Sequence, residues 1–300
     1  MPDIAIIGGG PAGLTAGLYA ARGGAKTELF EELFAGGQAA KTERIENYPG
    51  FPDGLDGYEI GALIERQAVK FGLNISYEGV TALHLDGPVK EIVLADRTVQ
   101  AAAVILAMGA TPRKLNLARE EDLTGAGISY CATCDGAFFK DKDVAVIGGG
   151  DTAISDALYL ARLCKSVTVV HRRDALRAAM ALQKQAFAMP NLHFAFDSVV
   201  TELVGEKSLA GLTLQNVKTG EQTALPVAGA FVAVGISPRT ELVQEALGLK
   251  PGAPIPTDAH METVIPNVFA VGDIRQTPLR QVLTACSDGA VAATAALERL

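Results

Sequence analysis

A pair of cysteines, Cys131-Ala132-Thr133-Cys134, offers the clearest chemistry in this chain of 300 residues. Two thiols at this spacing close into a disulfide and reopen, which exchanges two electrons with a partner. In an α/β chain the spacing indicates redox chemistry first. The alternative is a zinc site, which needs four ligands and usually two paired motifs. The sequence has a single such pair, two lone cysteines and four scattered histidines, so redox chemistry is favoured over a metal site.

The lone cysteines, Cys164 and Cys286, lie in apolar stretches and are interpreted as packing residues. Four cysteines in 300 residues are too few for a disulfide scaffold.

The overall composition is that of a folded, acidic protein. Apolar residues make up 49% of the chain and charged residues 20%, which excludes a disordered chain. The formal net charge of −8 argues against a nucleic-acid partner. No apolar run approaches the roughly 20 residues of a membrane span, and no basic leader precedes the first apolar stretch. We therefore expect a cytoplasmic protein that binds neither membrane nor nucleic acid.

A glycine-rich turn occurs twice, each time between a β-branched run and a stretch with helical apolar periodicity. Residues 4–13 read IAIIGGGPAG and residues 144–153 read VAVIGGGDTA. In a dinucleotide-binding turn the first glycine allows the tight bend and the second lets the backbone approach a pyrophosphate. The third position, glycine or alanine, lets helix and strand pack closely. The two turns predict two nucleotide sites, with Gly8, Gly10 and Gly13 in the first and Gly148, Gly150 and Ala153 in the second.

The residue that ends the following strand distinguishes the two predicted sites. Glu31 lies 23 residues after Gly8, where an acid accepts hydrogen bonds from a ribose. At the same offset after Gly148 stands His171, followed by the basic residues Arg172, Arg173 and Arg177. Guanidinium groups bind a 2′-phosphate, whereas a carboxylate repels it. The first site is thus predicted to hold a ribose without a 2′-phosphate, as in FAD, and the second to hold NADP(H). The alternative for these arginines is a solvated helix start.

Another repeat marks the joints between domains. Residues 104–113 and 231–239 each form a buried strand that ends in glycine and a proline-arginine step. We predict an α/β fold in which the second nucleotide unit, residues 114–241, is inserted into the first, residues 1–113 and 242–300.

Taken together, these motifs resemble low-molecular-weight thioredoxin reductases. The resemblance runs from residue 3 to about 298. The cysteine pair lies beside the second glycine turn, whereas glutathione-reductase-like relatives place it near the N-terminus. The matching segments are 131–136, 148–153, 171–177, Gly36-Gly37-Gln38, Glu46-Asn47-Tyr48-Pro49-Gly50, Val271-Gly272-Asp273 and Arg280-Gln281. The resemblance implies two Rossmann-like domains of three-layer ββα architecture.

The resemblance also implies which residues contact each cofactor. FAD is expected to contact Gly8, Gly10, Pro11, Ala12, Gly13, Glu31, Gly36, Gly37, Gln38, Asn47, Gly109, Gly272, Asp273, Arg280 and Gln281. NADPH is expected to contact Gly148, Gly150, Asp151, Thr152, Ala153, His171, Arg172, Arg173, Arg177 and Gly235. Alternative interpretations are a helix N-cap for Asp273 and a simple turn for residues 47–50.

By resemblance, electrons pass from NADPH through FAD and the Cys131–Cys134 disulfide to oxidised thioredoxin. Cys134 faces the flavin, Cys131 attacks the partner disulfide, and Asp135 supplies a proton. The alternative for Asp135 is a helix cap. The small, polar residues around Cys134 place it near a helix N-terminus, which favours its thiolate. The family alternates cysteines and nicotinamide at the flavin by rotating the second domain, and its members are homodimers.

The chain departs from the family pattern at three places. Met108 stands where the family often has threonine, and Ala126 stands where it often has arginine. After Asp135 the chain has Ala137, Phe138 and Phe139. The two phenylalanines either belong to a docking loop for thioredoxin or pack under a turn.

Two other functions compete with thioredoxin reduction. The same machinery could serve another dithiol protein or a ferredoxin-type electron donor, although the arginines after His171 favour NADPH. A different class is a nucleotide-binding regulatory module with an inert cysteine pair, which would lack a flavin.

Overall fold

The computed structural model describes residues 1–42, 45 and 47–300. The chain forms two compact units. Unit 1 comprises Met1–Thr111 and Ser237–Leu300, and unit 2 comprises Pro112–Ile236. Each unit is described below by itself.

Unit 1 is built on a five-stranded parallel sheet with the order β18-β7-β1-β2-β3. In the centre, Ile4 of β1 pairs with Thr27 of β2 on one side and with Ala103 of β7 on the other. The strands are β1 (Ile4–Ile7), β2 (Thr27–Phe30), β3 (Asn74–Ser76), β7 (Ala103–Leu106) and β18 (Val268–Ala270).

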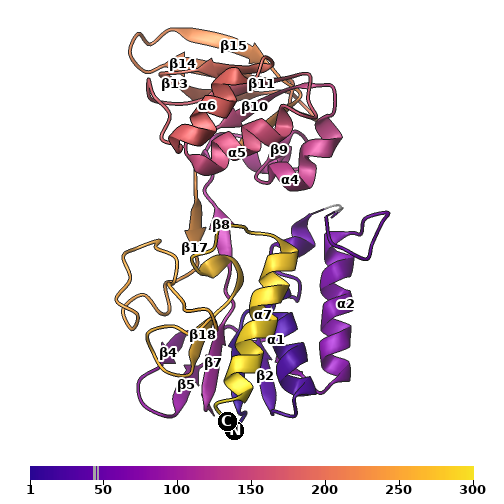
Figure 1. The fold of residues 1–300 in the computed structure, drawn as a ribbon, viewed down its shortest axis with the longest axis vertical. Helices are drawn as coiled ribbons and strands as arrows, with labels where there is room; N and C mark the ends of the chain where they lie inside the picture. Colours follow the sequence, from indigo (N-terminus) through magenta and orange to yellow (C-terminus); the bar gives the residue numbers. More distant parts are fainter. Residues whose placement is uncertain (43–44, 46) are drawn as a thin grey trace. The chain divides into compact units, whose positions relative to one another are not determined.

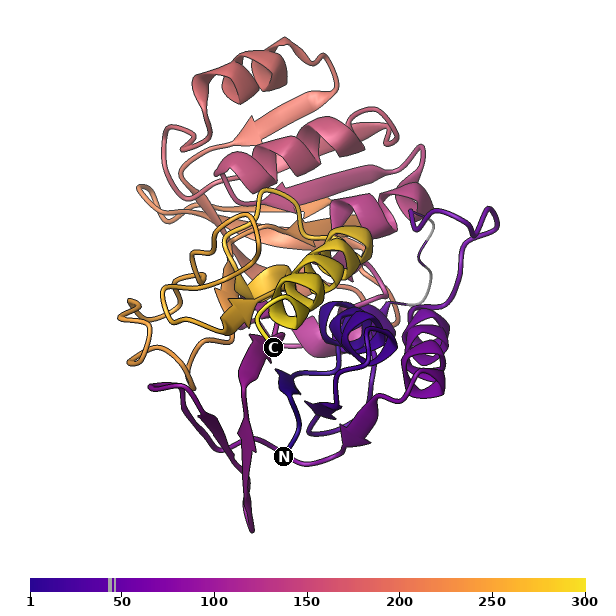
Figure 2. The same ribbon diagram turned by 60° about the horizontal axis from the view of Figure 1, so that its bottom comes forward.

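Side chains of the central strand alternate between two cores, which makes unit 1 three-layered. Ile4 and Ile6 belong to the core under the helices, whereas Ala5 and Ile7 belong to the core under an antiparallel sheet. The helices α1 and α7 lie side by side in Figures 1 and 2. The helices are α1 (Pro11–Arg22), α2 (Gly57–Lys70) and α7 (Val282–Leu297), and the antiparallel strands are β4 (Ala82–His84), β5 (Lys90–Val93) and β6 (Thr98–Ala101).

Unit 2 repeats this plan with the parallel order β12-β11-β10-β16-β9. Val144 and Val146 of β10 face the helical core, and Ala145 and Ile147 face the core under a second antiparallel sheet. The parallel strands are β9 (Ile128–Ser129), β10 (Asp143–Ile147), β11 (Ser166–Val170), β12 (Leu192–Ala195) and β16 (Gly229–Val232). The helices are α3 (Glu120–Leu123), α4 (Ala132–Asp135), α5 (Asp151–Leu160) and α6 (Met180–Ala188), and the antiparallel strands are β13 (Ser198–Val204), β14 (Gly211–Asn216) and β15 (Gln222–Pro226).

The chain crosses between the units twice, through β8 (Ala110–Pro112) and β17 (Ile236–Pro238), which pair in a two-stranded ribbon. Both strands end at a proline, which has no N–H to extend the pairing. Three short 3₁₀ segments complete the described structure: η1 (Ala39–Lys41), η2 (Gly136–Phe139) and η3 (Gly272–Ile274).

The predicted fold class is confirmed, since the structure is α/β with parallel sheets in layered, Rossmann-like units. Within the described residues, no helix is both long enough and apolar enough to cross a membrane.

Candidate active site

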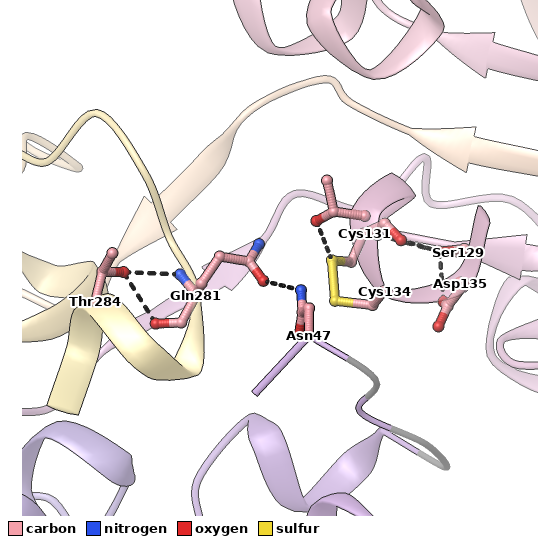
Figure 3. The surroundings of a disulfide bond; sticks show 8 residues. Asn47, Ser129, Cys131, Cys134, Asp135, Gln281 and Thr284 are labelled. Carbon is pink, nitrogen blue, oxygen red and sulfur yellow. Dashed lines mark hydrogen bonds between the residues drawn. A yellow bond between two sulfur atoms is a disulfide. The ribbon is translucent and has the colours of Figure 1, made fainter. Parts of the chain in front are cut away.

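The two cysteines of the predicted redox pair are joined in a disulfide, with a Cα–Cα distance of 5.3 Å. Cys131 is the N-cap residue of α4 and Cys134 lies within that short helix, so one turn brings the two side chains together (Figure 3). Both residues are half-buried, and the exposed Thr133 places its Oγ1 3.5 Å from Cys131 Sγ.

A buried serine connects the redox pair to the predicted acid. The Ser129 hydroxyl donates to Asp135 Oδ2 at 2.6 Å, and Ser129 Oγ accepts the Cys131 N–H at 3.1 Å. Asp135 stands at the N-cap position of the 3₁₀ segment η2, but its side chain makes no capping hydrogen bond there and accepts the Ser129 hydroxyl. Sequence reasoning missed Ser129, because serines are common and only the fold shows its bonding partners.

A second anchor holds the backbone just before Cys131. The buried carboxylate of Glu120 accepts the backbone N–H groups of residues 115–117 and the Tyr130 hydroxyl, the last at 2.7 Å. Burial, together with the Glu120 carboxylate, raises the pKa of Tyr130. Tyr130 therefore remains a neutral donor, and the residue adjacent to Cys131 is fixed to α3.

In the first glycine turn, between β1 and α1, contacts within the protein require glycine at two positions. Gly8 has φ +106°, and a Cβ there would lie 2.5 Å from the Ala107 carbonyl oxygen. A Cβ on Gly13 would lie 2.0 Å from the Gly8 oxygen, which explains the close packing of helix and strand. Pro11 and Ala12 form the first turn of α1.

Gly10 is different, because the fold does not require a glycine there. Its backbone is extended, and a Cβ would meet only Gly37 Cα, at 3.9 Å. The residues that follow β2 close this side: Gly36 donates its N–H to the Gly9 oxygen at 2.8 Å. Glu31 accepts the Gly9 N–H at 2.7 Å, which places its carboxylate at the turn; its contact with a ribose stays a prediction.

The start of α7 gathers the other residues assigned to FAD. Asn47 Nδ2 donates to Gln281 Oε1 at 2.8 Å, and Figure 3 shows the two side chains pointing toward each other. Asp273 lies within η3, whose N-cap residue is Val271, so the N-cap alternative for Asp273 is wrong. Burial raises the pKa of Asp273, and the Arg280 charge opposes that shift.

The remaining FAD candidates are backbone positions or exposed side chains. Gly272 and Gly109 both have positive φ, and Gln38 is exposed before η1. Residues 48–50 form a turn, and Tyr48 approaches Cys286 of α7 at 4.0 Å. Glu46 of this motif lies outside the described residues.

The second glycine turn, between β10 and α5, has the same construction. Gly148 has φ +150°, and a Cβ there would lie 2.4 Å from the Ala233 oxygen and 2.8 Å from the Ala153 methyl. Gly150 is extended, and nothing lies within 4 Å of the position its Cβ would take. A Cβ on Gly149 would strike the His171 ring at 2.4 Å. The end of β11 is therefore packed directly on the turn.

The basic residues after β11 form a loop that turns back to this motif. Arg177 donates its backbone N–H to the Gly149 oxygen at 2.7 Å, and Asp151 Oδ1 accepts the Ala179 N–H at 2.7 Å. The side chains of Arg172, Arg173 and Arg177 are exposed, whereas His171 is buried. Burial lowers the pKa of His171, and the neighbouring arginines add to the shift. Thr152 and Gly235 are exposed.

The residues whose roles the sequence left open fall into two groups. Cys164 and Cys286 are free thiols buried in the helical cores. Phe139 packs edge-on against Phe231, with ring centroids 5.4 Å apart, whereas Phe138 is exposed. Phe139 therefore packs against the core, whereas a docking role for Phe138 stays a prediction.

These sites fit dinucleotides in two respects. Open space lies beside the backbone of Gly10 and of Gly150. The fold itself does not require glycine at either position, but a bound pyrophosphate would, because it needs close approach to the backbone. In addition, the buried atoms Arg280 Nε and His171 Nε2 have no hydrogen-bond partner among the described residues. A bound anionic group would satisfy such atoms.

Comparison with known proteins agrees with this arrangement. The family model for pyridine nucleotide-disulphide oxidoreductases matches residues 2–289. A thioredoxin reductase of Streptomyces coelicolor is 48% identical over 294 residues, which cover 97% of this chain and 91% of the relative. A bifunctional thioredoxin reductase/thioredoxin of Mycobacterium leprae is 43% identical, covering 97% of this chain and 64% of that protein. The crystal structure of thioredoxin reductase from Streptococcus pyogenes matches with a TM-score of 0.91 at 43% identity, covering 100% of this chain and 99% of that chain.

The layered nucleotide-binding fold and the vicinal disulfide define an oxidoreductase, and the chain belongs to the pyridine nucleotide-disulphide oxidoreductase family. FAD and NADPH are the cofactors of this family, in agreement with the sequence prediction. Within the family the chain is a member of the thioredoxin reductases, which confirms the resemblance seen in its sequence.

Proposed function

We propose that this protein is an NADPH-dependent, FAD-containing reductase of the thioredoxin active-site disulfide. The observation that carries the proposal is the half-buried Cys131–Cys134 disulfide at the start of α4, with a carboxylate positioned beside it. The names of its relatives support thioredoxin as the partner, since one relative combines reductase and thioredoxin in a single chain.

Each cofactor is assigned to one unit. In unit 1, the turn at Gly10, the Glu31 carboxylate, and the Asn47, Asp273, Arg280 and Gln281 side chains would hold FAD. In unit 2, the turn at Gly150 and the basic loop from His171 to Arg177 would hold NADPH. When bound, the pyridine nucleotide supplies two electrons as hydride and the flavin relays them to a disulfide.

The protein's own chemistry begins with Cys131 and Cys134 reduced. The Cys131 thiolate attacks one sulfur of the partner disulfide, so a Cys131–partner bond forms while the partner's S–S bond breaks. The departing partner thiolate takes up a proton. The Cys134 thiolate then attacks Cys131 Sγ, which re-forms the Cys131–Cys134 bond and releases the second partner thiolate for protonation. The partner gains two electrons, and the cysteine pair loses two.

Asp135 is the proposed proton carrier for these steps. It follows Cys134 directly in the chain, and the hydroxyl of Ser129 holds its carboxylate in place. A carboxyl that is positioned by a buried donor can transfer protons to a nearby leaving group.

We also propose that unit 2 rotates relative to unit 1, which would alternate the cysteine pair and the nicotinamide at the flavin. The ribbon of β8 and β17 is the hinge we assign, because all connections between the units pass through it. A disulfide engineered to lock the units should leave flavin bound and abolish turnover, whereas retained turnover would rule out the rotation. A homodimer and a cytoplasmic location remain predictions.

The test of function is NADPH oxidation by the purified flavoprotein with oxidised thioredoxins, another oxidised dithiol protein and a ferredoxin control. We expect turnover with thioredoxin. Cys134→Ser should abolish it while NADPH still reduces the flavin, and Cys164→Ser, which alters a buried free thiol, should behave like the parent.

Other outcomes would redirect the proposal. Turnover with only the other dithiol protein would change the acceptor, and flavin reduction by ferredoxin alone would change the donor. A purified protein without flavin absorption, at about 450 nm, would indicate a regulatory nucleotide-binding module instead.

A further inference from the structure

We infer that Ser129 is a positioning residue for the proton-transfer step, because it holds the Asp135 carboxylate against the backbone of Cys131. The inference rests on the proposed function, in which Asp135 carries the proton. It concerns unit 2 alone, and Figure 3 shows the arrangement.

The Ser129 hydroxyl donates its one proton to the Asp135 carboxylate. Ser129 Oγ lies 2.6 Å from Asp135 Oδ2 and 3.3 Å from the Cys131 carbonyl oxygen. A hydroxyl has one proton, and a hydrogen bond to a charged carboxylate is shorter and stronger than one to a carbonyl. The proton therefore points to Asp135, and a lone pair of the same oxygen accepts the Cys131 N–H at 3.1 Å.

Burial makes this connection stiff. Ser129 is 4% exposed and ends β9, the edge strand of the parallel sheet, which pairs with β16. Asp135 is only half-buried and sits at the end of a helix of four residues, so the sheet holds the carboxylate through Ser129. Phe231 of β16 pairs with Ser129 in register, which extends the support to the centre of unit 2.

The connection does not involve sulfur. Its partners are a backbone N–H and a carboxylate, so opening the Cys131–Cys134 bond breaks neither hydrogen bond. The hydrogen bond from Ser129 to Asp135 can therefore persist when the pair is oxidised, when it is reduced and when a mixed disulfide forms.

The inference predicts that the effect of Ser129 on the reaction depends on Asp135. Ser129→Ala should slow thioredoxin reduction about tenfold, the effect of losing one hydrogen bond of about 1.4 kcal/mol. Ser129→Thr, which keeps the hydroxyl, should stay within about twofold of the parent. In an Asp135→Asn background, Ser129→Ala should cause no further loss, because the group it positions is already gone.

A second reaction tests the inference without nucleotide or thioredoxin. Dithiothreitol reduces the Cys131–Cys134 disulfide by attacking one sulfur and releasing the other as a thiolate, which takes up a proton. We would follow this reaction by alkylation and mass spectrometry for the parent and the same variants, and expect the same pattern of rates. If thioredoxin turnover is absent in the parent, the proposed function fails, and the dithiothreitol rates still decide the role of Ser129.

The matched control is Ser166→Ala, which removes another serine-to-aspartate hydrogen bond of unit 2, 2.9 Å to Asp143 Oδ1, outside the cysteine segment. This variant should leave both rates within about twofold. Equal rates for Ser129→Ala and the parent would overturn the inference, as would additive losses in the double variant with Asp135→Asn. If Ser129→Thr does not fold, the double variant carries the test.

Discussion

Arg275 and Asp288 form a two-pronged ion pair at the end of η3: Arg275 Nε lies 2.8 Å from one carboxylate oxygen and Nη2 3.2 Å from the other. The side chains are only 16% and 10% exposed. Asp288 Oδ2 also accepts the Gly272 N–H at 3.1 Å. The pair thus joins α7 to the turn that carries Asp273, a residue assigned to FAD.

Replacing Asp288 by Asn should destabilise unit 1 and weaken flavin binding. The change leaves a largely buried guanidinium without its counter-charge, which costs about 3 kcal/mol. We expect a lower midpoint in urea denaturation and a lower ratio of flavin to protein. The exposed ion pair of Arg97 and Glu78 provides the control, since Glu78→Gln should change neither measurement. Equal effects of the two substitutions would contradict a special role for Asp288.

Alanine substitutions at two glycines of the second turn should affect stability and NADPH binding separately. Gly150→Ala should fold with stability unchanged to about 0.5 kcal/mol, because its backbone is extended and the added methyl enters open space. It should weaken NADPH binding at least about tenfold, by occupying the space assigned to the pyrophosphate. Gly148→Ala should lose about 2 kcal/mol or more of stability, because of its positive φ and the nearby Ala233 oxygen. Thermal melts and NADPH titrations measure both effects; unaltered NADPH affinity in Gly150→Ala would argue against the site.

The exposed arginines after His171 should select the phosphorylated coenzyme. The double variant Arg172→Ala and Arg173→Ala should raise the KM for NADPH by about 10- to 100-fold and change the KM for NADH little, because only NADPH carries the 2′-phosphate. Lys184→Ala, which removes an exposed cation of α6, is the control and should affect neither coenzyme. A similar rise for both coenzymes would remove the phosphate assignment.

Asp156 of α5 should make stability depend on pH. Burial raises its pKa from 3.8 to about 6. Because the folded protein holds this proton more tightly than the unfolded chain does, ionisation of Asp156 opposes folding, and stability falls as the pH rises from about 4 through 6. The stability of Asp156→Asn should match that of the parent at pH 3.5 and exceed it by about 3 kcal/mol at pH 8. If the stabilities of the parent and of Asp156→Asn instead change in parallel between pH 3.5 and 8, Asp156 is not desolvated.

Much of the site could be predicted because its signals are local. The positive φ of Gly8 and Gly148 is indicated by the glycine-rich segments around them, and Cys131 and Cys134 are close in space because one helical turn separates them. The alternation of β1 and β10 between two cores likewise follows from the two-residue period of a strand. Such features depend on neighbours in the chain, which the amino-acid order specifies directly.

The polar contacts that hold these residues in place depended on the tertiary structure. Asn47 meets Gln281 across 234 positions, and Asp288 reaches Gly272 only because α7 packs beside the parallel sheet. Ser129 is close to Asp135 in sequence, but its commitment to that carboxylate follows from its burial at the end of β9. Nor could the sequence tell which of Phe138 and Phe139 packs against the core, where Phe139 meets Phe231 of β16. Side-chain partners of this kind are decided by packing, since a hydroxyl, an amide or a carboxylate bonds to whichever group the fold brings within about 3 Å.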